Sequence, residues 1–150
     1  MSRKRYEGFS LIEILVVVAL IIILATITIV AINPGKNFRD TRNAQRSSDV
    51  NSILNAVTQY TTDGNTLPAG ILACDNAGVP QASKIGTGTG NIDLTVLTAG
   101  EADYIVSIPT DPTDGTAEDT GYTICTVGTR VQIAAPNAEP IGTKVISVRR

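Results

Sequence analysis

The chain has no histidine and no tryptophan, and it has only two cysteines, two phenylalanines and one methionine. Without histidine it lacks the most common general base near neutral pH and a common zinc ligand. The cysteines, Cys74 and Cys125, are too far apart to form a C-x-x-C motif, which argues against a redox centre or a cysteine-based zinc site. No convincing nucleophile–base pair is present either. The sequence therefore predicts a protein that is not an enzyme and has no cofactor.

Positive charge is scarce in the distal part of the chain. From Asp63 to Glu139, ten acidic residues stand against only Lys84 and Arg130. A surface of this sign repels a phosphate backbone. Direct binding of nucleic acid by this region is therefore not expected.

A long apolar run dominates the N-terminal part of the chain. Residues 9–32 form 24 consecutive positions in which Glu13 is the only ionisable residue. As a helix the run spans roughly 36 Å, enough to cross a hydrocarbon core of about 30 Å. It is longer than the apolar core of a secretory signal, and no A-x-A-like site ends it, so a membrane anchor fits better. Basic residues flank both ends, but the cysteines and the threonine-rich distal region favour a cytoplasmic N-terminus.

Glu13 raises a question of its own. A carboxylate deep in a transmembrane helix costs about 2.5–3.5 kcal/mol, and less near the helix end. One reading is that Glu13 lies close to the interface and reaches water. The other is that it has a functional partner inside the membrane.

A short basic leader is followed by the stretch Gly8-Phe9-Ser10-Leu11-Ile12-Glu13 and then by about 20 apolar residues. This pattern resembles the prepilin signal of type IV pilins and type II secretion pseudopilins. The resemblance implies that residues 1–8 are a leader, cut off between Gly8 and Phe9 by a prepilin peptidase that then methylates Phe9. It implies that residues 9–32 form a transmembrane and assembly helix. In related filaments the glutamate corresponding to Glu13 neutralises the N-terminal ammonium of a neighbouring subunit, since a buried carboxylate is far less costly when paired.

The family resemblance also implies function, partners and location. The expected function is that of a structural subunit of a type IV pilus-like filament, polymerised through its N-terminal helix. The alternatives are a pseudopilin of a secretion or DNA-uptake system and a plain membrane-anchored ligand-binding domain. Expected partners are copies of the same chain, other pilin-like subunits, the processing peptidase and the assembly platform. The precursor is expected in the cytoplasmic membrane, and the mature chain in an extracellular pilus or a pseudopilus that spans the periplasm.

Residues 33–63 are predicted to form a stem helix after an Asn-Pro-Gly break. Pro34 interrupts the apolar helix. Either Asn33 caps a second helix that begins at Pro34, or a single long helix is kinked at this point. Members of the family that the chain resembles usually carry their proline inside the apolar half. An apolar stripe follows, formed by Val50, Ile53, Leu54, Val57 and Tyr60. The charged residues before the stripe are expected to form a collar that is solvated, touches anionic lipid or faces the acidic head of a neighbouring subunit: Arg39, Asp40, Arg42, Arg46 and Asp49.

Residues 64–150 are predicted to form a small β-rich head, which makes the fold class α+β with the stem helix packed on an antiparallel sheet. A two-residue turn at Gly128-Thr129 predicts a hairpin. Segments 68–90 and 109–120 are expected to be loops. The expected strands are Asn91–Leu97, Tyr104–Ile108, Tyr122–Val127, Arg130–Ala135 and Thr143–Val148.

Two features of the head have competing interpretations. Cys74 and Cys125 form a disulfide if the head lies outside the cytoplasm, worth about 4 kcal/mol in the chain-entropy model, or remain two buried thiols. Seven carboxylates and no lysine or arginine lie between residues 91 and 120. The acidic loop within this stretch, residues 111–119, is expected to be solvated, with calcium binding as the lesser alternative.

Overall fold

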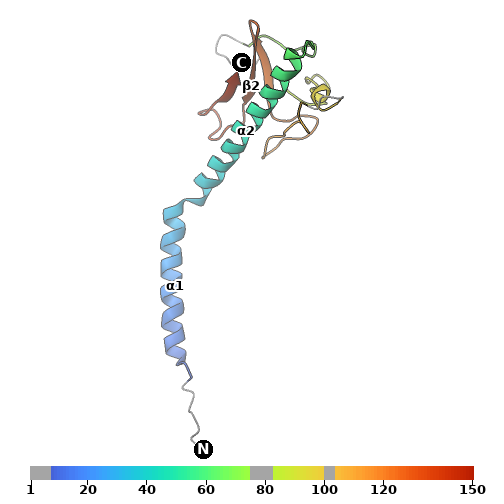
Figure 1. Ribbon diagram of the computed structural model, residues 1–150. Coiled ribbons are helices and arrows are strands. Elements are labelled where there is room, and N and C mark those ends of the chain that lie inside the picture. Colours follow the sequence, from blue (N-terminus) through green and yellow to red (C-terminus); the bar gives the residue numbers. More distant parts are fainter. Residues whose placement is uncertain (1–7, 75–82, 100–103) are drawn as a thin grey trace, which may run out of the picture. The chain divides into compact units, whose positions relative to one another are not determined.

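The computed structural model describes residues 8–74, 83–99 and 104–150 (Figure 1). The chain divides into two compact units, residues 1–38 and 39–150. The fold class is α+β, as predicted: two helices precede a small three-stranded antiparallel sheet.

Helix α1 (Leu11–Ile32) contains the apolar run, and none of its residues is buried. It is long and apolar enough to cross a membrane by length and composition. Thr26 and Thr28, the two hydroxyl side chains within it, each donate to the carbonyl four residues earlier, to Ile22 and Leu24 at 2.8 Å. A helix that is apolar all round needs an apolar environment, and none of the residues of this helix is buried in the described structure.

Of the two alternatives at the Asn-Pro-Gly break, the structure has two helices. Asn33 adopts a left-handed conformation (φ 47°) and ends α1, and α2 (Pro34–Thr62) begins at the next residue. Pro34 has no N–H to leave unpaired at this first position. The Asn33 side chain accepts a hydrogen bond from the backbone N–H of Lys36 at 3.3 Å, so Asn33 also caps α2.

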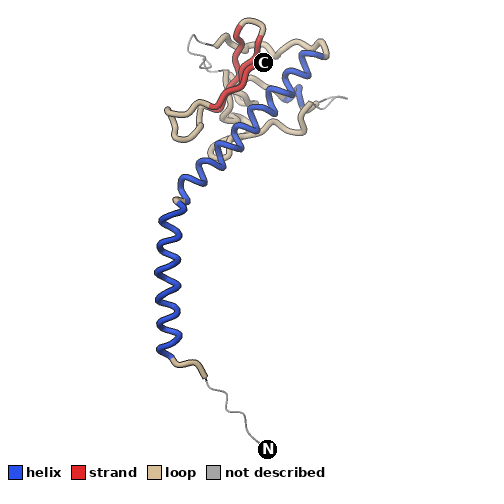
Figure 2. The backbone as a smooth tube through the Cα atoms, turned by 60° about the vertical axis from the view of Figure 1, so that its left-hand side comes forward, coloured by secondary structure: helices blue, strands red, loops and turns tan. Residues whose placement is uncertain are grey.

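The sheet has the order β1-β2-β3, with both pairs antiparallel (Figure 2). β1 (Thr123–Val127) and β2 (Arg130–Ala135) form the predicted hairpin, in which Val127 pairs with Arg130. Gly128 has φ 61°, the left-handed value that the first position of such a turn requires. β3 (Ile146–Arg149) pairs with the other edge of β2.

The core of the head lies between α2 and the sheet. The predicted stripe is confirmed: Val50, Ile53, Leu54 and Val57 are buried and Tyr60 is partly buried. They pack in one cluster with residues of the sheet and of the loops, among them Ile85, Leu94, Leu97, Tyr122, Ile124, Val131 and Ile133. Burial of this stripe fixes which face of α2 meets the head.

Two of the predicted strands are wrong. In place of a strand at 91–97, Ile92 makes one bridge to Ile85 and a single 3-10 turn, η1 (Thr95–Leu97), follows. The Asp93 side chain accepts the N–H of Thr95 at 2.8 Å, a local bond that competes with a strand ladder.

Residues 104–108 form bends and irregular backbone. The N–H groups of Tyr104 and Ile105 both donate to the carbonyl of Leu97, which leaves no ladder to continue. The last strand begins at Ile146 instead of Thr143, because Thr143 closes a turn with Pro140. The loop 68–90 also pairs in part, since Ala73 bridges Thr126.

Candidate processing and assembly site

The Gly8–Phe9 peptide bond lies outside the helix. Ser10 is extended (φ −73°, ψ 142°) and α1 begins only at Leu11. Phe9 is 81% exposed, and a side chain placed on Gly8 would meet no atom within 4 Å. Gly8 does not have a positive φ either. Among the described residues, no contact therefore requires glycine at this position.

Glu13 lies in the first turn of α1 and is exposed. Its spacing from Ser10 is that of a capping box, a signal that our sequence analysis missed, yet Ser10 makes no side-chain cap. Within residues 8–74, 83–99 and 104–150, the Glu13 carboxylate has no hydrogen bond or ion pair. The carboxylate is thus free to receive a charge from outside the described chain.

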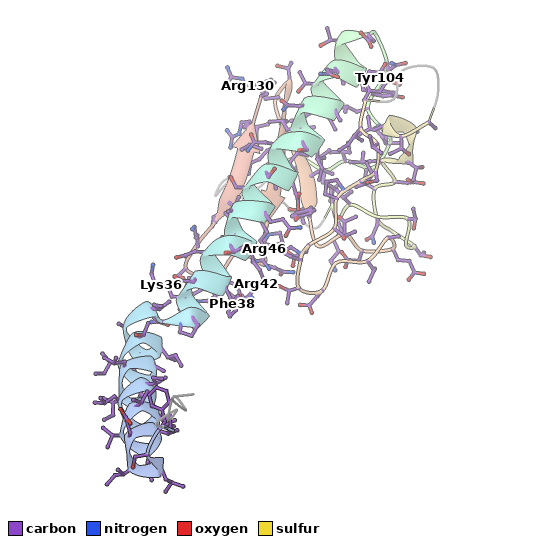
Figure 3. The ribbon with its side chains drawn as sticks, turned by 60° about the horizontal axis from the view of Figure 1, so that its bottom comes forward. Lys36, Phe38, Arg42, Arg46, Tyr104 and Arg130 are labelled. Atoms are coloured by element: carbon purple, nitrogen blue, oxygen red, sulfur yellow. A yellow bond between two sulfur atoms is a disulfide. The ribbon has the colours of Figure 1, made fainter. Side chains whose placement is uncertain are left out.

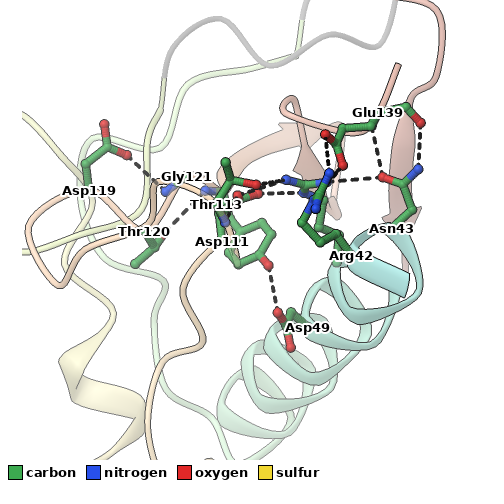
Figure 4. A network of polar contacts seen from close by, with 11 residues as sticks. Arg42, Asn43, Asp49, Asp111, Thr113, Asp119, Thr120, Gly121 and Glu139 are labelled. Carbon is green, nitrogen blue, oxygen red and sulfur yellow. Dashed lines mark hydrogen bonds and ion pairs between the residues drawn. The ribbon is translucent and has the colours of Figure 1, made fainter. Parts of the chain in front are cut away.

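In the head, a buried ion pair ties the acidic loop to α2. Arg46 donates from Nε to Asp111 Oδ2 at 2.7 Å and from Nη2 to Asp111 Oδ1 at 3.0 Å. The two side chains are 1% and 0% exposed. Thr113 adds its hydroxyl as an acceptor for Arg46 Nη2 at 2.8 Å and its backbone N–H as a donor to Asp111 Oδ1 at 2.9 Å. Both oxygens of Asp111 are therefore engaged (Figure 4).

A second set of bonds attaches Glu139 to the same helix. Arg42 binds the Glu139 carboxylate through Nε at 2.7 Å and Nη2 at 2.8 Å. Asn43 donates to the Glu139 carbonyl at 2.6 Å and accepts its N–H at 2.9 Å. Arg46 Nη1 reaches Glu139 Oε2 at 3.4 Å. We call Arg42, Asn43, Arg46, Asp111 and Glu139 the stem–head cluster; its two arginines project from α2 in Figure 3.

The cluster sets the charge states of its carboxyl groups. Burial acts to raise the pKa of Asp111, but the hydrogen bonds from Arg46 and Thr113 and the charge of Arg46 outweigh it, so this pKa is lowered. The hydrogen bond from Arg42 lowers the pKa of Glu139. Further along α2, burial and a 2.7 Å hydrogen bond to Asp49 raise the pKa of the Tyr122 hydroxyl. The cluster is thus held in its charged form at neutral pH.

These contacts correct two predictions. The charged collar on α2 is not free to face lipid or a neighbour at Arg42 and Arg46, because both are paired within the head. The acidic loop is exposed at Asp114 and Glu118, as expected, but Asp111 is buried, and Asp119 pairs with Lys84 at 2.6 Å. Among the residues that the structure describes, no group of three or more acidic, histidine or cysteine side chains is placed to hold a metal ion.

A signal for the buried arginine was present in the sequence. Asn43, Arg46, Val50, Ile53 and Val57 recur every three or four residues, so the two polar residues lie on the same face of α2 as the apolar stripe. Our sequence analysis ended the stripe at Val50 and assigned Arg46 to the charged collar. Arginine is rarely buried unless it is paired. The partner, Asp111, is 65 residues away in the sequence.

The structure joins Cys74 and Cys125 by a disulfide. Cys125 is buried in the middle of β1, and the backbone N–H of Cys74 donates to Thr126 at 2.9 Å. The segment around residue 73 thus pairs with the outer edge of β1, and the disulfide holds it there. Phe9 and Glu13 belong to the first unit and the cysteines to the second, so the predicted residues make two separate sites.

Comparison with known proteins bears on the N-terminal site. Residues 3–29 match the family model of the prokaryotic N-terminal methylation motif. The chain matches no curated protein and no solved structure. The matched residues include Gly8, Phe9 and Glu13. The motif implies processing by a prepilin peptidase and assembly with other pilin-like subunits, and it indicates a structural subunit instead of an enzyme. The chain therefore carries the signature of type IV pilins and pseudopilins, with an apolar helix that fits a membrane-anchored precursor.

Proposed function

We propose that this chain is a structural subunit of a type IV pilus-like filament, cut between Gly8 and Phe9, methylated at Phe9 and polymerised through α1. The precursor is held in the cytoplasmic membrane by residues 9–32, and residues 33–63 and 64–150 serve as stem and head. Its partners are further copies of itself, other pilin-like subunits and an assembly platform. The mature chain stands in a filament outside the membrane, where an oxidising environment favours the disulfide.

The observation that carries the proposal is the Glu13 carboxylate in an apolar helix, for which the described residues supply no partner. No residue of α1 is buried, so the whole surface of this helix is available for a membrane and then for neighbouring helices. Cleavage leaves an ammonium on Phe9, four positions before Glu13. A subunit that brings its Phe9 ammonium to the Glu13 of a neighbour neutralises both charges, whereas a misplaced one leaves two charges in apolar surroundings. Glu13 thus sets the register of assembly.

A pseudopilin of a secretion or DNA-uptake system shares the same motif and the same helix. Dependence on calcium in the acidic loop would favour that alternative. Because Arg46 occupies both oxygens of Asp111, we expect the head to be indifferent to calcium, which is why we prefer the pilus-like filament. Sheared surface fractions of producing cells separate the two, since a pilus is recovered there and a pseudopilus is not.

The test compares the wild-type chain with Glu13→Gln, which keeps the size of the side chain and removes its charge. The intact mass of the membrane and filament fractions reports processing, and the wild type should start at N-methyl-Phe9. We expect Glu13→Gln to be processed but to give at least about tenfold fewer filaments, the ratio produced by about 1.4 kcal/mol per docking step. Equal filament yields would remove charge pairing from the proposal.

Thr26→Val is the matched control. It changes another polar residue of α1, whose hydroxyl bonds within its own helix to Ile22. We expect wild-type filament yields from it. A wild-type chain that retains Met1 or Ser2 as its first residue in its native membrane would contradict the proposal as a whole.

A further inference from the structure

One apolar side chain stands out from the head on a braced turn. Ile141 is 75% exposed. It lies in a turn in which the Thr143 N–H and hydroxyl both bond to the Pro140 carbonyl, at 3.1 and 2.8 Å. Gly142 supplies the left-handed residue of this turn, with φ 81°. We call residues 140–143 the Ile141 turn.

The stem–head cluster braces this turn. Glu139, immediately before it, is bound through its carboxylate by Arg42 and through its backbone by Asn43. On the other side β3 begins at Ile146 and is paired with β2. A rigidly presented apolar side chain loses little conformational entropy on binding, which suits it to a contact surface.

A pocket of about 290 Å³ opens elsewhere on the head. Its described lining is largely apolar and includes Ile85, Leu94, Val106 and Ile108, with Asp93 among them; we call it the η1 pocket. A dry cavity of about 150 Å³ is enough to hold benzene. The η1 pocket is therefore large enough for one branched aliphatic side chain.

The two features are carried by segments on opposite sides of α2. In Figures 1 and 3 the chain leading into β3 lies with the sheet on one side of this helix, and η1 lies with the loops on the other. A protrusion and a pocket on different faces of one molecule form a head-to-tail contact between copies, which repeats as an open helical array unless it closes into a ring.

The charges beside these features also match. Lys144 follows the Ile141 turn directly and is exposed, and Asp93 lines the η1 pocket and is exposed. Opposite charges at the rim of an apolar contact contribute orientation more than affinity. They favour one direction of docking, with Lys144 of one copy close to Asp93 of the next.

We propose that the Ile141 turn of one subunit inserts Ile141 into the η1 pocket of a neighbouring copy of this chain. The contact rests on the proposed filament function: α1 polymerises the subunits and this contact joins their heads. A small apolar ligand in the pocket is the competing occupant, and it makes no use of Ile141.

Disulfide cross-linking within filaments tests the contact. One chain carries Ile141→Cys, and a second carries Ala117→Cys in the lining of the η1 pocket. Cells that produce both should give filaments with a covalent dimer after mild oxidation, and cells that produce either one alone should not. In the control, Ser52→Cys replaces Ala117→Cys. Ser52 is exposed on α2 and is not among the described lining residues of the η1 pocket, so we expect no dimer.

A variant series reports the energetic weight of the contact. Ile141→Asp should lower filament yield at least fivefold with unchanged thermal unfolding of the head, and Ile141→Leu should retain the wild-type yield. The head contact is overturned if Ile141→Asp gives the wild-type filament yield and cells that produce Ile141→Cys together with Ala117→Cys give no dimer. The proposed function remains in that case. Dimers from Ile141→Cys alone would indicate a symmetric contact and also overturn it. Absence of filaments from the wild-type chain overturns the proposed function, and this contact with it.

Discussion

Arg46 and Asp111 form a two-pronged ion pair in the interior of the head, with nitrogen–oxygen distances of 2.7 and 3.0 Å. The pair joins α2 to a loop 65 residues later in the chain. Gly121 makes this approach possible, because a side chain at that position would stand 2.7 Å from the Asp111 Cβ and its φ of 78° disfavours other residues. The acidic loop is thus held by an arginine of the stem helix.

Asp111→Asn should destabilise the head strongly. It leaves the buried Arg46 charge with only the more distant carboxylate of Glu139, at 3.4 Å, as a counter-charge. Removing one partner of a buried ion pair costs about 3–5 kcal/mol. Urea unfolding of the detergent-solubilised chain, followed by circular dichroism, measures the loss.

Asp119→Asn is the matched control, because the Lys84–Asp119 pair is similarly short but exposed, at 55% and 41% of the two side chains. An exposed pair contributes about 0–1 kcal/mol. Equal losses from Asp111→Asn and Asp119→Asn would show that burial of the Arg46 pair has no energetic weight.

Below neutral pH, the stability of the head should change only in the acidic range. The pKa values of Asp111 and Glu139 are lowered in the folded chain, so the folded state favours the deprotonated forms. The stabilisation is complete above the ordinary carboxyl pKa of about 4, and it is lost as the pH falls through the lowered folded values. We expect a constant thermal midpoint from pH 7 to about pH 5 and a steep fall below about pH 4.

The double variant Arg46→Met/Asp111→Leu removes both charges of the pair and should flatten this acid slope. The measurement is thermal unfolding by circular dichroism at several pH values. An acid slope as steep as that of the wild type would assign the effect to other carboxyl groups.

Removing the disulfide should weaken the head without changing its fold. Cys74 and Cys125 are 51 residues apart, and a bridge that closes such a loop contributes about 4 kcal/mol in the chain-entropy model. In Cys74→Ala/Cys125→Ala the free energy of unfolding should therefore be lower by this amount, and the urea midpoint should fall accordingly. The far-ultraviolet circular dichroism spectrum should not change.

Reducing agent provides the internal control for the disulfide. It should shift the wild-type transition toward that of the double variant and leave the double variant itself unchanged. Wild-type stability that is insensitive to reduction would contradict the predicted contribution.

Gly8→Leu should leave the leader attached. The structure shows no steric need for glycine at this position, so the requirement is assigned to the peptidase that must accommodate the residue before the cut. Intact mass of the membrane fraction should give the full-length chain for Gly8→Leu. Gly35→Leu, at an exposed position of α2, should be cut like the wild type. Normal cleavage of Gly8→Leu would remove Gly8 from the processing site.

The sequence by itself determined the features that depend on neighbours along the chain. The apolar run, the Gly8, Phe9 and Glu13 pattern and the stripe on α2 can all be recognised from neighbouring residues. At Asn33 the sequence predicted the position of the break, and the structure decided between one kinked helix and two helices. The β1–β2 hairpin belongs with them, because two residues and one positive φ specify its turn.

Only the tertiary structure decided the features that depend on distant partners. Arg46 is buried because Asp111 meets it from a remote loop. The backbone groups of Ile92 are bonded to Lys84 and Gly86, from another loop, in place of a strand ladder. The η1 pocket is lined by residues from separate segments between Ile85 and Thr120, so no local pattern predicts it. A short segment of sequence does not contain both partners of a long-range contact. Such contacts can therefore be identified only in the folded structure.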